Sequence, residues 1–466
     1  MSLLPTRKGR TMSELINKAL KTATETKDII FGDDVNKEAG ALFARLYPDQ
    51  KVLVVADENT YGAVGDTVVA SLREAGVEFA DEPYIFPGTP TLYGDYVNVS
   101  KLREVIRPYE NTVVMSLGAG TLNDIAKLAS GELGREYINV CTAASVDGFC
   151  SFGASISKDG FKITRNCPAP AGLVMDIQTM MEAPYRLTAT GYGDLIEKIP
   201  AGADWILSDE LGIEPIDDYV WSLVQGPLMD SLGDPEAVRN CEHDAIAKLG
   251  EGQVMSGLAM QAHQSSRPAS GAGHQFSHVW EMEGHGLDWE PPLSHGNKVG
   301  VGTVASLAIW EEFLKLTEAD FDAERAVAAM KTPEEVEANV RATLIPTIAE
   351  EAVKHSVGKL LPEDQLRERI ALLKEKWPTI KARCEAQIIP AQQAWDMLKT
   401  AGAPYHPEML KIDWDRFRET HYKAQMIRPR YTVLDVLMDL GLYDDVVARL
   451  FSPEGFWGRH PHPDAE

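Results

Sequence analysis

Three histidines and an aspartate stand in glycine- and serine-rich segments at spacings that suit a metal site. His274 and His278 are four residues apart in SGAGHQFSHVWEM, so both lie on one face if that segment is helical. His295 follows in LSHGNKVG, and Asp194 stands upstream in ATGYGDLIEK, at a glycine-rich helix start. One carboxylate and two imidazoles make an open three-ligand site for a divalent ion such as Zn²⁺, Ni²⁺ or Fe²⁺.

The alternative to a metal site is a structural one. An isolated HxxxH pair is more often a polar helix face or a packed histidine than a pair of ligands. Four such residues in similar surroundings favour the metal site. The motif HExxH does not occur in the chain, which argues against a zinc peptidase of that type.

A glycine-rich turn could bind a dinucleotide. The segment GAGTLND, residues 118–124, follows an apolar run typical of a strand and precedes a helical stretch. A helix that begins there would direct backbone N–H groups at an anion, and the glycines would let a pyrophosphate approach the backbone closely. Asn123 stands where the third glycine of GxGxxG would be, so a plain tight turn stays open as the alternative. Asp57 ends an earlier strand, where it could accept a hydrogen bond from a ribose hydroxyl or simply cap a helix.

The elements that must position these residues differ along the chain. Between about residues 50 and 180, β-rich runs alternate with helical stretches, as in 51–61, 67–76 and 111–130. Such repetition predicts a parallel sheet, with ligand sites at the carboxyl ends of its strands.

Helical patterns dominate from about residue 185. Four apolar residues recur at offsets of four, three and four, which places them on one helix face: Leu366, Ile370, Leu373 and Trp377. The segment TPEEVEANV opens with Thr332 as a cap, a proline, and Glu335 three residues after the cap, the pattern of a helix start.

The two patterns predict two domains. We expect an α/β dinucleotide-binding domain over residues 1–182 and an all-α domain, which binds metal and substrate, over residues 183–457. Residues 458–466 are expected to form a loose tail. The cleft between two such domains is the default place for a site.

Composition narrows the class of protein and of partner. The chain has 466 residues, of which 44% are hydrophobic and 25% charged, as in ordinary globular proteins. Its net charge of −25 disfavours nucleic acid and anionic membranes as partners, so an anionic substrate would need a local positive site. Five scattered cysteines, the lack of an apolar leader and the lack of a long apolar run lead us to expect a cytoplasmic protein with reduced thiols.

The motifs occur in the same order as in sn-glycerol-1-phosphate dehydrogenases, and the chain most resembles the bacterial branch of that family. The family lies within the dehydroquinate-synthase and iron-alcohol-dehydrogenase superfamily. The motifs are GAGTLNDIAK (118–127), TAASVDG (142–148), GYGD (191–194) with Asp204-Trp205, SRPASGAGHQFSH (266–278), His295-Gly296 and AQMIRPRYTVLDVLMDLGLYDD (424–445). The resemblance runs from about residue 50 to 457 and implies a Rossmann-like α/β domain followed by an all-α domain, the dehydroquinate-synthase-like fold.

The resemblance also implies residue roles. Asp194, His274 and His295 would hold one divalent metal, Zn, Ni or Fe. NAD or NADP would contact the residues Asp57, Gly118, Gly120, Thr121, Leu122, Asn123, Asp124, Thr142, Ala143, Ala144, Ser145 and Ser151. Asp147, Asp194 and His278 would face the substrate, with His278 as a proton relay or a hydroxyl partner and a role beside the metal ligands as the alternative.

The activity implied is the reversible, metal-dependent reduction of dihydroxyacetone phosphate to sn-glycerol 1-phosphate by NAD(P)H. Lys162, Lys198 and Arg267 are candidates for binding the phosphate, each with a structural ion pair as its alternative. Three other functions stay open: a dehydroquinate-synthase-like enzyme, another polyol or sugar-phosphate dehydrogenase, and a non-catalytic family member. We expect a homodimer.

The chain departs from the family pattern in several places. Ala119 replaces the usual middle glycine of the turn. Gly273 stands where a glutamate commonly precedes the first metal histidine, which puts in question the partner that would orient His274. An apparent insertion near residues 230–250 and a long C-terminal half exceed the usual length of the family.

Overall fold

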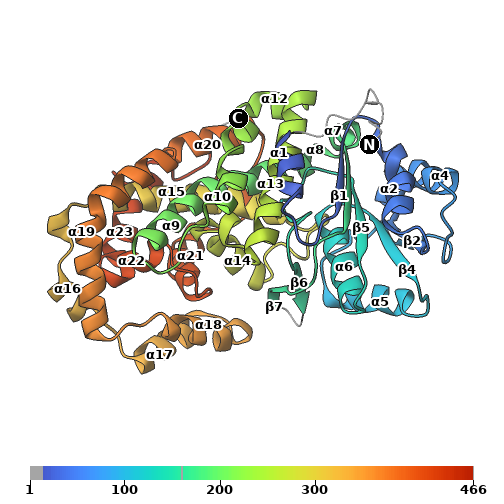
Figure 1. Ribbon diagram of the computed structural model, residues 1–466. Helices are drawn as coiled ribbons and strands as arrows, with labels where there is room; N and C mark the ends of the chain where they lie inside the picture. Colours follow the sequence, from blue (N-terminus) through green and yellow to red (C-terminus); the bar gives the residue numbers. More distant parts are fainter. Residues whose placement is uncertain (1–13, 159–160, 465–466) are drawn as a thin grey trace. The chain divides into compact units, whose positions relative to one another are not determined.

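The computed structural model describes residues 14–158 and 161–464, and its chain divides into two compact units (Figure 1). The first unit runs to Leu195 and also includes Gly226–Ser265 and Asp288–Pro292. The second unit comprises the remaining segments, Ile196–Gln225, Ser266–Leu287 and the chain from Leu293 onward. Each unit is described by itself.

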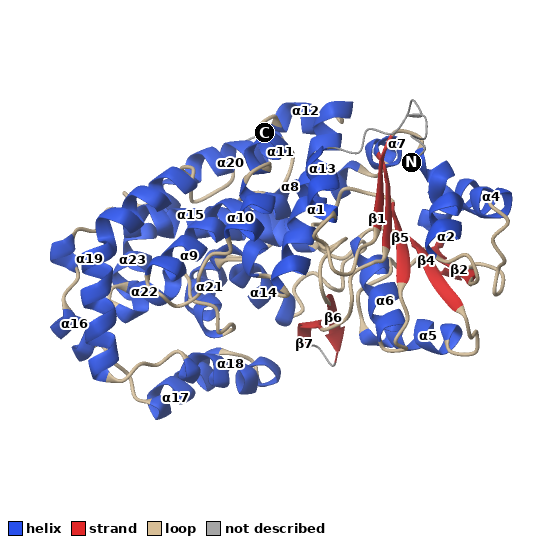
Figure 2. Cartoon of the chain, in the orientation of Figure 1, coloured by secondary structure: helices blue, strands red, loops and turns tan. Residues whose placement is uncertain are grey.

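Six strands of the described chain form one parallel sheet in the first unit (Figure 2). The strand order is β1-β8-β5-β4-β2-β3. The strands are β1 (Asp28–Gly32), β2 (Lys51–Asp57), β3 (Tyr84–Phe86), β4 (Thr112–Leu117), β5 (Tyr137–Cys141) and β8 (Gly172–Asp176). The pairing of β4 with both β2 and β5 brings the glycine turn after β4 beside the loop after β5, because parallel strands end at the same edge.

Helices cover both faces of this sheet, which explains why most residues of its strands are apolar. Val52 and Val54 of β2 pack with α2 (Ala39–Leu46) and α4 (Asp66–Glu74). Leu53 and Val55 point to the other face and pack with α5 (Tyr96–Ile106) and α6 (Gly120–Gly131). The predicted alternation of strand, turn and helix is therefore correct.

The other elements of the first unit are mostly helical. They are α1 (Glu14–Leu20), η1 (Val35–Glu38), α3 (Glu58–Thr60), η2 (Tyr61–Gly65), the hairpin β6 (Ala154–Lys158) and β7 (Phe161–Arg165), α7 (Ile177–Glu182), α8 (Tyr185–Leu195), α11 (Leu228–Leu232), α12 (Pro235–Arg239) and α13 (His243–His263). Helix α13 belongs to this unit because it packs on α1, α7, α8 and α11. Its Gln261 side chain accepts hydrogen bonds from the backbone of Glu25 and Thr26. The two units therefore interleave along the sequence, and the predicted domain limits stay a prediction.

The elements of the second unit are helices. They are α9 (Lys198–Glu210), α10 (Asp218–Gln225), η3 (Arg267–Ala269), α14 (Ala272–Met282), α15 (His295–Leu314), η4 (Glu318–Asp320), α16 (Ala323–Ala328), α17 (Pro333–Thr343), α18 (Pro346–Gly358), α19 (Glu363–Gln387), α20 (Ala391–Thr400), η5 (Pro407–Leu410), α21 (Trp414–Met426), α22 (Val433–Asp439), α23 (Tyr443–Leu450) and α24 (Phe456–Arg459). An α/β unit and a helical unit confirm the predicted fold class.

Local sequence signals account for these helices. The four apolar residues predicted on one face of α19 are all buried. Thr332 caps α17 and exchanges hydrogen bonds with Glu335, as the capping pattern predicts. At the C-terminal end, where we expect a loose tail, the Asp464 carboxylate contacts Trp395 Nε1 at 3.2 Å and Lys399 Nζ at 2.8 Å.

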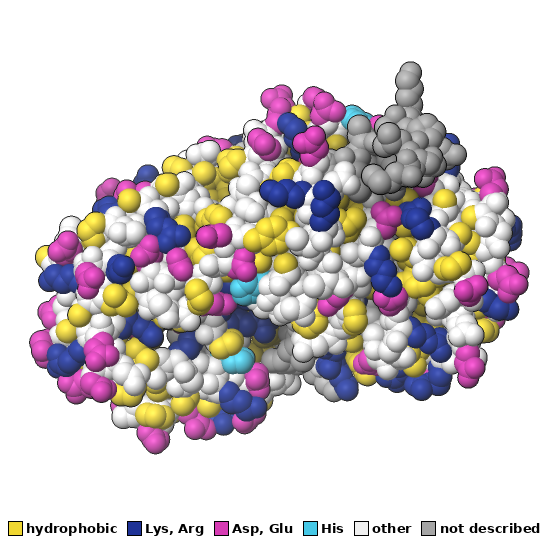
Figure 3. Space-filling model, viewed as in Figure 1, with side chains coloured by type: hydrophobic (Ala, Val, Ile, Leu, Met, Phe, Trp, Pro, Cys, Tyr) yellow, Lys and Arg dark blue, Asp and Glu magenta, His cyan; other side chains and the backbone are white. Residues whose placement is uncertain are grey.

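Charged side chains of both signs lie on the surface seen in one view of the molecule. On the face shown in Figure 3, acidic and basic side chains are interspersed with apolar ones. None of the described helices is both long and apolar enough to cross a membrane.

Candidate active site

The glycine turn lies between β4 and α6, at the carboxyl edge of the parallel sheet. Gly118 N–H donates to Val140 O of β5 at 2.9 Å, and α6 begins at Gly120. A Cβ atom on Gly120 would stand 2.8 Å from Val146 Cγ1, so the turn is closely packed against the loop after β5. The structure thus brings together the two predicted cofactor segments, 118–124 and 142–145, beside the amino end of a helix.

Several predicted cofactor residues serve the structure of these loops through their side chains. Asn123 accepts a hydrogen bond from the Tyr137 hydroxyl at 2.8 Å, and Asp124 accepts from Ser155 N–H at 2.9 Å. The Asp57 carboxylate accepts hydrogen bonds from Asn59 N–H and Thr60 N–H. Asp57 therefore caps a helix, which is the alternative to a contact with the ribose. Backbone groups and glycines, rather than these side chains, are what the turn offers to a pyrophosphate.

Lys127 is a residue of this site that sequence reasoning missed. Its ammonium is fully buried and donates to the carbonyls of Gly148, Ser151 and Gly153 at 3.0–3.1 Å. It therefore fixes the loop that follows the second cofactor segment. The signal was available, because Lys127 lies seven residues after Gly120 and so on the same face of α6.

Replacing Gly120 with valine should raise the KM for the nicotinamide cofactor. The new side chain would meet Val146 and stand at the amino end of α6. Loss of one charge-assisted hydrogen bond to a phosphate corresponds to roughly 10- to 100-fold in affinity. Cofactor titration monitored by fluorescence measures the change. Gly62→Val is the control, because nothing lies within 4 Å of a Cβ built on Gly62; unchanged cofactor binding in Gly120→Val would make the turn merely structural.

Three histidines converge in the second unit. His274 and His278 lie one turn apart on α14, as their spacing predicts, and His295 is the first residue of α15. The centroid of the His274 ring is 5.4 Å from that of His295, and the His278 centroid is 5.9 Å from each of the other two. The two helices approach closely at glycines, since a Cβ on Gly302 would stand 2.2 Å from Gly273 O. Close helix packing is therefore what brings the imidazoles together.

Two buried glutamates each lie against Nδ1 of one of these histidines. His274 Nδ1 lies 2.7 Å from Glu197 Oε2, and His295 Nδ1 lies 2.9 Å from Glu281 Oε1. A carboxylate at Nδ1 fixes the orientation of the ring and leaves Nε2 as the atom that can bind a metal. One nitrogen of His274 and one of His295 lie within 4.8 Å of each other, a separation that one ion could bridge.

The glycine before His274 is explained by Glu197. A Cβ on Gly273 would lie 2.9 Å from Glu197 Cγ, so a larger residue there would displace the glutamate. The question raised by Gly273 is therefore answered: the partner of His274 comes from α9's amino end instead of from its own helix. The Glu197 carboxylate also accepts from Gly271 N–H at 3.1 Å, which fixes the start of α14.

Asp147 and Asp194, both predicted to face the substrate, are neighbours in the first unit. Asp194 lies near the end of α8, and its Oδ2 accepts from Asp147 N–H at 3.0 Å. The Asp147 carboxylate in turn accepts from Ser256 Oγ at 2.7 Å. Asp194 precedes Glu197 by only three residues in the chain.

His278 contacts a guanidinium that sequence reasoning did not single out. Arg428 Nη2 and Nε lie 3.2 and 3.4 Å from His278 Nδ1. Burial, together with the charge of Arg428, holds the pKa of His278 well below its usual 6.5, so the ring is neutral at pH 7. Because Nδ1 accepts from the guanidinium, the proton of the neutral ring is on Nε2.

The predicted phosphate-binding residues fare differently. The buried guanidinium of Arg267 donates to Asp204 O at 2.8 Å and Tyr431 O at 3.2 Å, and its Nε lies 3.1 Å from Glu214. These contacts fit the structural role that is the alternative to phosphate binding by Arg267. Lys198 is fully buried at the start of α9. The side chain of Lys162 lies outside the described residues.

Asp204, part of one quoted motif, holds two helix starts. Its carboxylate accepts from Ala272 N–H at 2.7 Å and from Val433 N–H at 2.9 Å, the first residues of α14 and α22. Burial raises the pKa of Asp204 to about 7 in spite of these donors. The contact ties the segment before α22 to the helix that carries His274 and His278.

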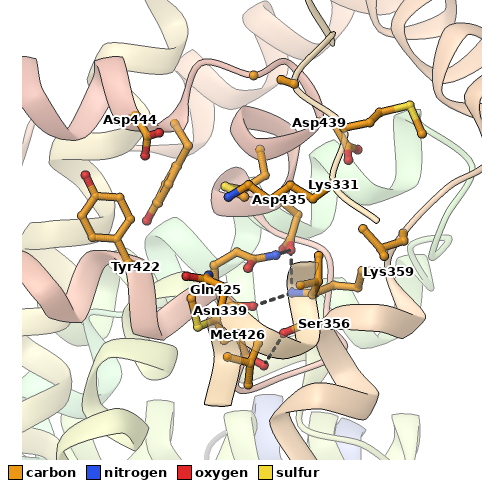
Figure 4. A pocket seen from close by; sticks show the side chains of 18 of the residues that line it. Lys331, Asn339, Ser356, Lys359, Tyr422, Gln425, Met426, Asp435, Asp439 and Asp444 are labelled. Carbon is orange, nitrogen blue, oxygen red and sulfur yellow. Dashed lines mark hydrogen bonds and ion pairs between the residues drawn. The ribbon is translucent and has the colours of Figure 1, made fainter. Parts of the chain in front are cut away.

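A cavity of about 450 Å³ in the second unit is lined by none of the three converging histidines, their two glutamates, Asp147 or Asp194 (Figure 4). It lies among α16, α17, α18, α21 and α22, and its lining is mostly apolar. The Lys359 ammonium inside it is 2.7 Å from Asp435, and Tyr431 donates to Asp439 at 2.7 Å. Its inner polar groups thus bond one another, and the histidine cluster is the better candidate for chemistry.

The chain is similar in sequence and in fold to several known dehydrogenases. Residues 30–184 match the family model described as iron-containing alcohol dehydrogenase. A probable glycerol dehydrogenase from Sinorhizobium meliloti 1021 has a similar structure, with a TM-score of 0.58 and 15% identity over 91% of this chain and 98% of that one. The butanol dehydrogenase A from Thermotoga maritima gives a TM-score of 0.55 at 16% identity over 90% and 97%. The chain thus shares the fold of these dehydrogenases, and its residues 30–184 match the iron-containing alcohol dehydrogenase family model.

Sequence relatives narrow the class. A glycerol-1-phosphate dehydrogenase [NAD(P)+] of Halalkalibacterium halodurans is 35% identical over 56% of this chain and 65% of its own length. Those of Bacillus velezensis and Pyrococcus furiosus are 34% and 32% identical, each over 60% of this chain and over 71% and 77% of their own lengths. The chain belongs to the glycerol-1-phosphate dehydrogenase family, which confirms the resemblance of its motifs.

Proposed function

We propose that this protein catalyses the reversible reduction of dihydroxyacetone phosphate to sn-glycerol 1-phosphate, with NADH or NADPH and one divalent metal. The observation that carries the proposal is the convergence of His274, His278 and His295, two of which are bonded at Nδ1 by buried glutamates. That arrangement suits metal ligation, and it occurs in a chain of the glycerol-1-phosphate dehydrogenase family.

Asp194, His274 and His295 would hold the metal. The donor set is one carboxylate and two imidazoles, which suits Zn, Ni or Fe. Asp194 is carried on the same stretch of chain as Glu197, the partner of His274, and this short connection supports its place as the third ligand. A divalent ion at these residues would supply Lewis-acid polarisation of the substrate's carbonyl oxygen.

The other residues of the site would bind, orient and move protons. The 118–124 turn would hold the cofactor's pyrophosphate at the amino end of α6. Asp147, fixed by Ser256 and adjacent to Asp194, would bind a substrate hydroxyl. His278 would exchange the proton at Nε2 with the substrate oxygen, since its Nδ1 is engaged by Arg428.

Replacing Glu281 with glutamine should weaken metal binding by about 10- to 100-fold, because the neutral amide no longer favours the orientation of His295 that frees Nε2. Competition with a chelator of known affinity measures the change. Glu283→Gln is the matched control: this carboxylate is two residues further on and bonds Arg416 and Lys423 instead of a histidine. Equal metal affinity in the Glu281 variant and the wild type would contradict the role of this glutamate.

The function is tested by following NADH and NADPH oxidation with a panel of substrates and metal-loaded protein. We expect turnover with dihydroxyacetone phosphate and a much lower kcat/KM with dihydroxyacetone. A preference for the unphosphorylated ketone would favour a polyol dehydrogenase instead. We also propose a homodimer, which sedimentation analysis of the purified protein tests.

A further inference from the structure

We infer that Arg428 binds the phosphate group of the substrate, an inference that rests on the proposed function. Arg428 stands in the loop between α21 and α22, and its guanidinium contacts His278 Nδ1. The His278 ring contacts that guanidinium, and its centroid is 5.9 Å from the centroid of each of the other two histidines. One short substrate could therefore place an anionic end beside Arg428 and its reacting carbonyl beside His274 and His295.

The guanidinium lacks a counterion among the described residues. Its contact there is with the imidazole of His278, which accepts at one atom, whereas an arginine has five N–H donors. The carboxylate that acts on it through space, Glu281, is bonded to His295. Arg428 is half-buried, and a cation partly withdrawn from water without an anionic partner is costly; burial accordingly lowers the pKa of Arg428. A dianionic phosphate would remove this cost.

Arg416, on the helix before this loop, is an arginine of the same unit whose charge is balanced by a carboxylate. Its Nη1 also lies 2.8 Å from a histidine, His285 Nδ1, but its Nη2 donates to the Glu283 carboxylate at 2.8 Å. Arg267, one of the residues expected to bind phosphate, likewise has Glu214 as a partner. Unlike Arg416 and Arg267, Arg428 is not paired with a carboxylate among the described residues, and it lies beside His278. The charge of Arg428 is therefore available to a ligand.

The loop that carries Arg428 is held in place before any substrate binds. Arg430 Nη1 donates to Ser270 O at 2.6 Å, and its Nη2 donates to Ser266 Oγ at 3.0 Å. Asp204 joins the first residue of α22 to the first residue of α14, as described above. The guanidinium is thus fixed relative to the helix of His274 and His278, and pre-organised donors bind an anion at a lower entropic cost.

The chemistry of the site favours a phosphate monoester over a carboxylate or a neutral ligand. A guanidinium forms two parallel hydrogen bonds to neighbouring oxygens of a phosphate and still has a donor for His278. The chain carries a net charge of −25, so a small dianion would not be attracted by the protein as a whole and needs a local cation. Arg428 supplies that cation: it contacts His278, whose ring is a neighbour of the proposed metal ligands His274 and His295.

Kinetics of Arg428→Gln, Arg428→Lys and the control Arg416→Gln test the inference. Arg428→Gln should raise the KM for dihydroxyacetone phosphate by about 10- to 100-fold and the KM for dihydroxyacetone, which has no phosphate, much less. Because Arg428 also contacts His278 Nδ1, any fall in kcat should be shared by the two ketones. Arg428→Lys keeps the charge and loses the planar fork, so its KM for dihydroxyacetone phosphate should lie between those of Arg428→Gln and the wild type. Arg416→Gln should keep the wild-type values. Thermal unfolding of each variant shows whether it folds normally.

Titration with inorganic phosphate, followed by calorimetry on the metal-loaded protein, gives a readout besides activity. The wild type should bind phosphate about 10- to 100-fold more tightly than Arg428→Gln. Equal phosphate affinities would overturn the inference, as would an equal loss of kcat/KM on both ketones, which would make Arg428 only a positioning residue for His278. A wild type that fails to reduce dihydroxyacetone phosphate would refute the proposed function, and the phosphate titration alone would then decide the inference.

Discussion

Replacing His274 or His295 with alanine is expected to remove the bound metal and to lower kcat/KM for dihydroxyacetone phosphate by about 10³-fold or more. Each variant deletes an imidazole whose Nδ1 is bonded by a carboxylate, so a buried glutamate loses its partner as well. A metal that polarises a carbonyl contributes several kcal/mol to the stabilisation of the transition state, which sets this magnitude. Elemental analysis and steady-state kinetics on one preparation measure both effects.

His243→Ala is the control for adventitious metal binding. His243 also lies close to two carboxylates, Asp33 at 2.7 Å and Asp244 at 3.0 Å, but it is exposed and belongs to the first unit. This variant should keep about one metal ion per chain and its full activity. Wild-type protein that is active without metal, or a His274 variant with normal metal content and rate, would refute the metal site.

Replacing His278 with alanine should lower kcat by about 10²- to 10⁴-fold while metal and cofactor stay bound. This range is typical of the loss of a general acid or base, and it applies if proton transfer limits turnover. His278 is placed for that role because its Nδ1 accepts from Arg428, which leaves the Nε2 proton for the substrate oxygen.

Metal stoichiometry measured beside kcat separates the alternatives for His278. Full metal content with nearly normal kcat would remove it from the mechanism. Depleted metal would mean instead that the ring supports His274, from which its centroid is 5.9 Å away.

The residues that the sequence identified share a local signal. The four-residue spacing of His274 and His278 follows from the helix period, and the turn at residues 118–124 follows from a strand that is directly succeeded by a helix. In the same way, alternating strands and helices predicted the sheet. These patterns depend on neighbours within a few residues.

The residues that the sequence did not reveal act through contacts that are distant in the chain. The Glu197 carboxylate accepts from Gly271 and His274, which are 74 and 77 positions later at the start of α14, and Arg428 contacts His278 across 150 positions. Gly273 puts the partner of His274 in question because that partner, Glu197, comes from the start of α9 and not from the helix of His274. Which of several arginines is paired with a carboxylate depends on tertiary packing, so the sequence does not separate Arg267, which has such a partner, from Arg428.

The grouping of α13 with the first unit has the same cause. The Gln261 side chain accepts hydrogen bonds from the backbone of Glu25 and Thr26, which are 236 and 235 positions earlier in the chain. No local sequence pattern predicts this contact. Periodicity identifies α13 as a helix but does not show which core it joins.

The identity of the product tests the central claim most directly. Metal-loaded protein would be incubated with dihydroxyacetone phosphate and NADH or NADPH, and the enantiomer of the product determined by chiral chromatography and by a dehydrogenase specific for sn-glycerol 3-phosphate. We predict sn-glycerol 1-phosphate, formed in step with cofactor oxidation and absent when His274 is replaced by alanine. Formation of sn-glycerol 3-phosphate, or of no glycerol phosphate by protein that holds both metal and cofactor, would contradict the account.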